Sequence, residues 1–253
     1  MRKFKSALLQ RFTTTNEGPV TQYLGCQLIR DRPIRTSQLV QTAYTERLLR
    51  TFGMWDEDHT VATLMLPGTR LVKADCPDTP SPTLQCRYRN IVGSIGYLVQ
   101  MTRCDMAFAY GQLSLSLHNP GPVHVAAAGR ALEYVRGIHN QGLSYCDPGT
   151  DNRNVLTVWV NSNFAADSDT RRSVTGYIMS LNGAPISWRS CRVKLSSMTL
   201  NTSLPAPSPK RTPTSVLFCQ VTTSFDRAPL GPKCVWEDNA ACIFMSENPV
   251  NRD

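Results

Sequence analysis

Three strand-like stretches follow one another in the second half of the chain. The first, Val155 to Val160, is an apolar run that includes β-branched residues. The second, Ser173 to Leu181, roughly alternates between two faces, as a strand does. Asn182-Gly183 comes next and favours a type I′ turn, because both central residues of that turn have positive φ. The pattern therefore predicts a hairpin whose return strand covers Ala184 to Ser190.

Helical spacing of apolar residues dominates the first half of the chain, and a hairpin interrupts it. Gly53 stands where a C′ glycine would end a helix. Pro122 suits the first turn of a later helix, and Gly137 suits the position just past the last turn of that helix. The predicted helices cover Arg2–Phe12, Thr42–Phe52, Arg87–Met101, Asp105 to about Leu117, and Pro122 to about Gly137. The predicted hairpin pairs Val20–Asp31 with Arg35–Gln41.

Two stretches show neither the alternation typical of a strand nor the spacing of apolar residues typical of a helix. Residues from Trp55 to Cys86 are rich in Pro, Thr and Asp and predict an irregular linker. Residues 198–233 hold six prolines, a density that excludes a continuous helix. This second stretch is either a disordered Pro/Ser/Thr-rich linker or a segment translated in the wrong reading frame. We favour the wrong frame, because the character of the sequence changes abruptly after Ser197.

Composition adds limits on partners and location. The 253 residues carry a net charge of +8, with 27 basic and 19 acidic residues. That excess suits a polyanionic partner and is also common among soluble proteins without one. The nine cysteines and four histidines are scattered singly, which favours free thiols over a zinc site or a disulfide framework. No signal peptide or transmembrane segment is recognisable, so we expect an intracellular protein, cytoplasmic or nuclear, without a membrane partner.

The sequence from residue 161 onward carries a specific resemblance. NSNFA, then DTRRSVTGY, LNGAPISW and LSS, resembles the ribonuclease H domain at the end of copia-type LTR-retrotransposon Pol polyproteins. YRNIVGSIGYLVQMTRCDMAFAYGQLS resembles the connection segment of the same family, with Cys104 where Pro is usual. The resemblance covers about residues 1–198 and 234–253. It implies a fragment of a reverse transcriptase and ribonuclease H polyprotein.

The resemblance also implies a fold and a domain order. We expect an α/β chain of the α+β kind, with a mostly helical thumb and connection before an incomplete ribonuclease H-like mixed sheet. The expected order is the end of the reverse transcriptase palm and thumb (1–55), an irregular linker (56–86), a helical connection (87–140) and an incomplete ribonuclease H-like domain (141–253). Within the last, residues 198–233 are frameshifted or disordered. A Y-x-D-D polymerase strand is not part of this sequence.

The catalytic residues of that family are largely missing. Ribonuclease H hydrolysis uses two magnesium ions held by clustered carboxylates, and the first family Asp is replaced here by Asn161. The second carboxylate falls within 198–233, the third matches Asp238, and the fourth would follow Asp253. Asp238 would bind metal only in a complete site, and it is equally explained as a helix N-cap. We therefore expect no Mg²⁺ and no other cofactor for the chain as written.

The sequence thus predicts a catalytically inactive Pol fragment, with two alternatives. One is a residual module that binds RNA–DNA hybrid or other nucleic acid without sequence preference, through Arg171, Arg172 and Ser173. The other is an active ribonuclease H whose gene has been misread. We expect Asp167 and Asp169 to balance the charges of the neighbouring arginines. Other parts of a Pol polyprotein are further candidate partners.

Overall fold

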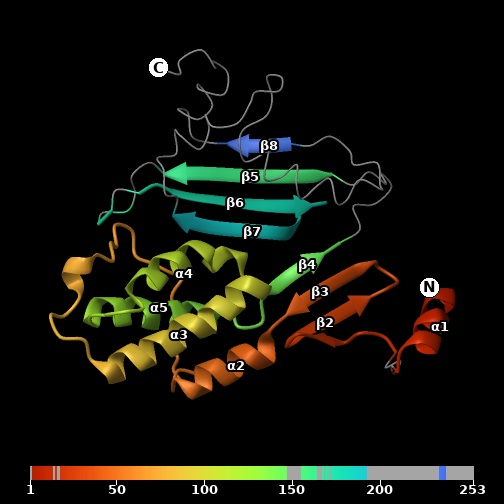
Figure 1. Cartoon of the computed structure of the whole chain (residues 1–253), viewed down its shortest axis with the longest axis horizontal. Helices are drawn as coiled ribbons and strands as arrows, with labels where there is room; N and C mark the ends of the chain where they lie inside the picture. Colours follow the sequence, from red (N-terminus) through yellow and green to blue (C-terminus); the bar gives the residue numbers. More distant parts are fainter. Residues whose placement is uncertain are drawn as a thin grey trace, which may run out of the picture.

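The computed structural model places two small sheets around a helical body (Figure 1). It describes residues 2–146, 155–163, 167–192 and 234–237, apart from residues 14, 16, 17, 168 and 171. The mixed α/β class predicted from the sequence is confirmed. The proline-rich stretch 198–233, and the helix we predicted after Asp238, lie outside the described residues.

The first part of the chain forms a small sheet and a helix that packs beside it. The pairing of the predicted hairpin is confirmed, but its first strand, predicted as Val20–Asp31, is broken by positive φ angles at Leu24 and Gly25 into two shorter strands. Gly53 has φ +73° and follows the second helix, as predicted for a C′ glycine. The elements are α1 (Arg2–Arg11), β1 (Gln22–Tyr23), β2 (Cys26–Asp31), β3 (Thr36–Val40) and α2 (Thr42–Thr51).

The helical body follows the linker. Its longest helix begins at Pro82 rather than Arg87, because Ser81 caps it and Pro82 occupies the first turn. The predicted helix from Asp105 to Leu117 is instead a short α-helix between two 3-10 turns. The elements are η1 (Lys73–Asp75), α3 (Pro82–Met101), η2 (Cys104–Met106), α4 (Ala107–Leu113), η3 (Ser114–Ser116) and α5 (Pro122–Gly137).

One face of α3 forms the centre of the hydrophobic core. The predicted apolar stripe is buried along its whole length, from Tyr88 to Val99. Tyr88 is 0% exposed, and its hydroxyl donates a hydrogen bond to the Leu113 carbonyl oxygen at 2.7 Å. Burial raises the pKa of Tyr88 above its ordinary value. The core therefore holds its largest polar side chain as a neutral, fully paired phenol.

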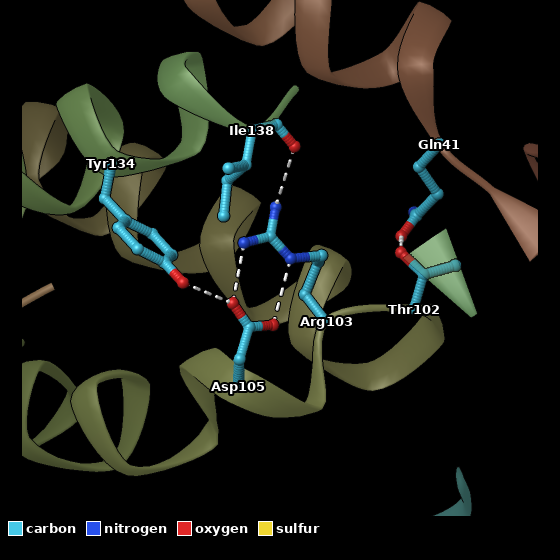
Figure 2. Close-up of polar contacts among 6 residues, drawn as sticks. All are labelled: Gln41, Thr102, Arg103, Asp105, Tyr134 and Ile138. Atoms are coloured by element: carbon cyan, nitrogen blue, oxygen red, sulfur yellow. Dashed lines mark hydrogen bonds and ion pairs between the residues drawn. The ribbon is translucent and has the colours of Figure 1, made fainter. Parts of the chain in front are cut away.

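A buried arginine joins the ends of α3 and α5 (Figure 2). Arg103 is 4% exposed, and its Nε and one terminal nitrogen donate to the two carboxylate oxygens of Asp105 at 2.9 and 2.7 Å. Its other terminal nitrogen donates to the Ile138 carbonyl oxygen at 3.4 Å, just past α5. The Tyr134 hydroxyl donates to the same carboxylate at 3.0 Å. This cluster fixes the turn after α3 against the end of α5.

The strand after α5 returns to the first sheet. β4 (Gly142–Tyr145) pairs antiparallel with β3, giving a four-stranded order β1-β2-β3-β4. The predicted domain boundary between residues 140 and 141 falls immediately before β4. The helical body is therefore inserted between two adjacent strands of one sheet. The division into four domains itself stays a prediction.

The second sheet is mixed. Its strands are β5 (Leu156–Asn163), β6 (Val174–Leu181), β7 (Ala184–Arg192) and β8 (Cys234–Glu237). The order is β7-β6-β5-β8, with β8 parallel to β5 and the other pairs antiparallel. Asn182 and Gly183 have φ of +52° and +81°, which confirms the type I′ turn. The Trp188 indole donates to the Val99 carbonyl oxygen at 2.8 Å and so ties this sheet to α3.

Within the described residues, no helix combines the length and the apolar character needed to cross a membrane.

The arginine cluster gives a stability prediction. We expect Asp105→Ala to lower the free energy of unfolding by about 2–3 kcal/mol, because it leaves the buried Arg103 guanidinium without its charge partner. Asp58→Ala removes an exposed carboxylate and should change stability by less than about 0.5 kcal/mol. Urea unfolding of the two variants beside the wild type measures both values. Equal stability of the two variants would show that the Arg103 cluster contributes nothing.

Candidate functional site

The predicted chemistry lies where β5 ends. β5 runs past its predicted end at Val160 to Asn163, so Asn161 belongs to the strand, and its side chain is exposed. The parallel register pairs Val160 with Glu237 of β8. The carboxyl ends of β5 and β8 therefore meet at one edge of the sheet, which is where open α/β sheets carry ligands. Asp238, the next residue after β8, lies outside the described residues.

The described residues at this edge do not fit a two-magnesium site. Magnesium prefers hard, anionic oxygen ligands, whereas the Asn161 amide offers one neutral oxygen. Across the described ranges, no three His, Cys, Asp or Glu side chains gather closely enough to hold a metal ion. The donor set therefore lacks the charge that a pair of dications requires.

The loop between β5 and β6, residues 167–173, is the basic loop of this structure. Arg172 is exposed, as a phosphate-binding side chain must be. Ser173 is only 1% exposed, so its hydroxyl is not on the surface beside Arg172. Arg171 lies outside the described residues. Of the three predicted nucleic-acid contacts, the structure thus brings Arg172 to the surface and buries Ser173.

The acidic residues of the basic loop have other partners than expected. The Asp167 carboxylate accepts from the guanidinium of Arg192, at the end of β7, and from the Thr170 hydroxyl. Burial by itself raises the pKa of Asp167, but these two hydrogen bonds outweigh it and hold the pKa below its ordinary value. Asp169 accepts a hydrogen bond from the backbone N–H of Lys73 at 3.0 Å. Among the described residues Asp167 therefore balances Arg192 and not Arg172, whereas Arg171 lies outside them.

A hollow of about 490 Å³ lies between α3, α4 and β7. Its lining includes Tyr110, Trp188 and Arg189 and none of the predicted site residues. The candidate chemistry is therefore confined to the end of β5 and the basic loop.

Comparison with known proteins identifies the family. The chain is 35% identical over 191 residues to the "Retrovirus-related Pol polyprotein from transposon TNT 1-94" of Nicotiana tabacum, an alignment covering 74% of this chain and 14% of that protein. It is 30% identical over 245 residues to the Pol polyprotein from transposon RE2 of Arabidopsis thaliana, covering 96% of this chain and 16% of that protein. The chain belongs to the retrovirus-related Pol polyproteins of copia-type transposons.

A shorter relative is aligned over most of its own length. The "Uncharacterized mitochondrial protein AtMg00810" of Arabidopsis thaliana is 32% identical over 186 residues, which cover 73% of this chain and 72% of that protein. The chain spans 14% and 16% of the TNT 1-94 and RE2 polyproteins, so it corresponds to a small part of a Pol polyprotein. No family model and no solved structure matches it.

Sequence reasoning missed the partners of the basic loop in this Pol fragment. Arg192 and Lys73 are 25 and 96 positions away from the aspartates they contact. Arg192 belongs to no motif quoted for the family, Lys73 belongs only to a linker segment, and no local pattern links either residue to the loop. Only the pairing of the strands and the path of the linker bring them together.

Two carboxylates should make the stability of the fold depend on acid pH. Burial tends to raise the pKa of Asp105, but the Arg103 guanidinium and the Tyr134 hydroxyl hold it below its ordinary value, and the pKa of Asp167 is lowered too. A lowered pKa stabilises the fold above the unfolded value of about 3.9, and this contribution is lost as the pH falls through the folded value. Wild-type unfolding free energies, measured in urea, should therefore drop below about pH 4.

The double variant Asp105→Asn, Asp167→Asn tests the assignment. It should be less stable than the wild type at pH 6, and its stability should change less between pH 5 and pH 2. Parallel curves for the two proteins would show that other groups govern the acid response.

Proposed function

We propose that this chain is a ribonuclease H-like Pol fragment that does not cleave RNA–DNA hybrid. The observation that carries the proposal is the exposed Asn161 at the edge where β5 and β8 end together. Hydrolysis by two metal ions needs carboxylates that neutralise both ions and fix them about 4 Å apart. An amide can complete a coordination shell, but it adds no negative charge.

We also infer that residues 198–233 are translated out of frame. The alignment with the RE2 polyprotein covers 96% of the chain, and the remaining 4% is too short to contain this stretch. The alignment therefore extends across it, and the sequence resembles the family again from residue 234, so the change after Ser197 is confined to one segment. In that case the second family carboxylate is encoded in the DNA and absent from the protein. An active ribonuclease H would then require a restored frame as well as Asp at position 161.

The proposed inactivity predicts two negative results. Neither the wild type nor Asn161→Asp should cleave a labelled RNA–DNA hybrid in 5–10 mM Mg²⁺ (about the usual assay range), because one added carboxylate leaves the metal set incomplete. A gel assay of product length measures this. Cleavage by either protein would refute the proposal. Sequencing the gene from codon 190 to codon 253 shows whether a frame error is available to correct.

Sequence-independent binding of nucleic acid is the second candidate function. The observation that favours it is Arg172, which is exposed and, among the described residues, forms no ion pair. The Asp167 carboxylate of the same loop pairs with Arg192, so it does not compete with a phosphate for Arg172. A net charge of +8 adds long-range attraction for a polyanion. Such binding should weaken steeply with salt, because each phosphate contact releases counterions.

Arg172→Gln tests this candidate. We expect weaker binding to an RNA–DNA hybrid and a salt slope smaller by about one, as expected for one lost phosphate contact. Arg11→Gln removes the same charge from α1, which lies on the opposite side of the structure from the end of β5, and should change the slope less (Figure 1). Fluorescence anisotropy over a salt series measures both slopes. Equal effects of the two variants would mean that only net charge matters, and no binding at low salt would refute the candidate.

A further inference from the structure

Two aspartates connect the basic loop to different parts of the fold. Asp167 is buried, and its carboxylate holds Arg192 at the end of β7. Its Oδ1 also accepts from the backbone N–H of Asp169 at 3.2 Å, and its own N–H donates to the Arg172 carbonyl oxygen at 3.1 Å. The two ends of the loop are therefore bonded to each other through Asp167.

Asp169 reaches across to the linker. Its Oδ2 accepts the Lys73 backbone N–H at 3.0 Å, from a residue that precedes the whole helical body in the chain. Lys73 begins η1, a turn closed by the Asp75 N–H donating to the Val72 carbonyl oxygen at 3.1 Å. The second tie therefore joins the loop to an ordered turn rather than to a free segment.

The start of α5 holds this turn in place. A Cβ atom built on Gly121 would lie 1.9 Å from the Asp75 carbonyl oxygen, so only a glycine permits this approach. The His124 side chain, which is 0% exposed, caps the same helix start by accepting the Gly121 N–H at 3.0 Å. The partner of Asp169 is thus fixed against the helical body.

We propose that Asp169 and Asp167 are positioning residues that hold the basic loop so that Arg172 can contact a nucleic-acid backbone. This inference rests on the nucleic-acid binding proposed above. Among the described residues, the Asp167 carboxylate is held by Arg192 and Thr170 and the Asp169 carboxylate by the Lys73 N–H, so both side chains order the loop and neither pairs with Arg172. The linker turn and the binding loop then act as one unit, although 96 residues separate Lys73 from Asp169.

A positioning role and a purely electrostatic role of Asp169 predict opposite changes in nucleic-acid affinity when Asp169 is replaced by Ala. Removing an acidic side chain close to a polyanion-binding loop should strengthen binding if charge alone counts. If Asp169 positions the loop, Asp169→Ala should instead weaken binding, because it removes the acceptor for the Lys73 N–H. Asp169→Asn loses the charge and keeps an acceptor oxygen, so it separates the two effects.

The experiment compares variants of the full chain by anisotropy with an RNA–DNA hybrid over a salt series. We expect Asp169→Ala to reduce the salt slope by about one, as Arg172→Gln does, while Asp169→Asn binds at least as tightly as the wild type. The double variant Asp169→Ala, Arg172→Gln should bind no more weakly than Arg172→Gln alone, because the two changes remove one contact. Asp58→Ala, at an exposed acid with no ion pair among the described residues, is the charge control.

Hydrogen exchange supplies a readout that does not depend on binding. The Lys73 amide should exchange faster in Asp169→Ala than in the wild type and Asp169→Asn. If the wild type binds the hybrid and Asp169→Ala binds it equally well or more tightly, this inference alone is overturned. A wild-type chain that binds no hybrid at low salt would overturn the proposed binding function, and the inference with it.

Discussion

A single buried cation determines how the helical body closes. Arg103 cannot be deprotonated under folding conditions, so its guanidinium must be paired wherever it is buried. Asp105 and the Ile138 carbonyl oxygen supply that pairing, and they come from the turn after α3 and from the end of α5. The position of α5 in turn sets where β4 leaves to rejoin β3. The paired arginine, whose contacts Figure 2 shows, thus connects the packing of the helical body to the strand that completes the first sheet.

The second sheet depends on this body through a few specific bonds. The Trp188 indole donates to α3, and the Tyr145 hydroxyl donates from β4 to the Pro185 carbonyl oxygen in β7 at 3.1 Å. The Asp169 contact with the linker adds a third tie on the side of the basic loop. Each joins residues far apart in the chain; the first two are partly buried, and the third lies at the surface. Such bonds specify orientation more than they add net stability.

Much of the fold was predictable because short-range sequence patterns determine it. The stripe along α3, the Asn182-Gly183 turn and the glycine after α2 each dictate conformation within a few residues. The break of the 105–117 helix into shorter turns was missed, since helical spacing alone does not separate an α-helix from 3-10 turns. The sequence also did not predict the parallel pairing of β5 with β8 or the contact between Asp167 and Arg192. Both depend on strand pairing between distant segments, which no local period encodes.

The structure separates carboxylates that hold the fold from those that would perform chemistry. Asp105 and Asp167 each satisfy a guanidinium, so replacing them leaves a cation unpaired and costs stability. Asn161 is exposed at the end of a strand whose neighbouring apolar residues already form the core. An amide there has the shape of a carboxylate, keeps the strand intact and removes a charge that only a metal ion would compensate. An amide at this position therefore leaves the sheet and the basic loop in place. Under the function proposed above, binding through the basic loop would then not depend on a complete set of metal ligands.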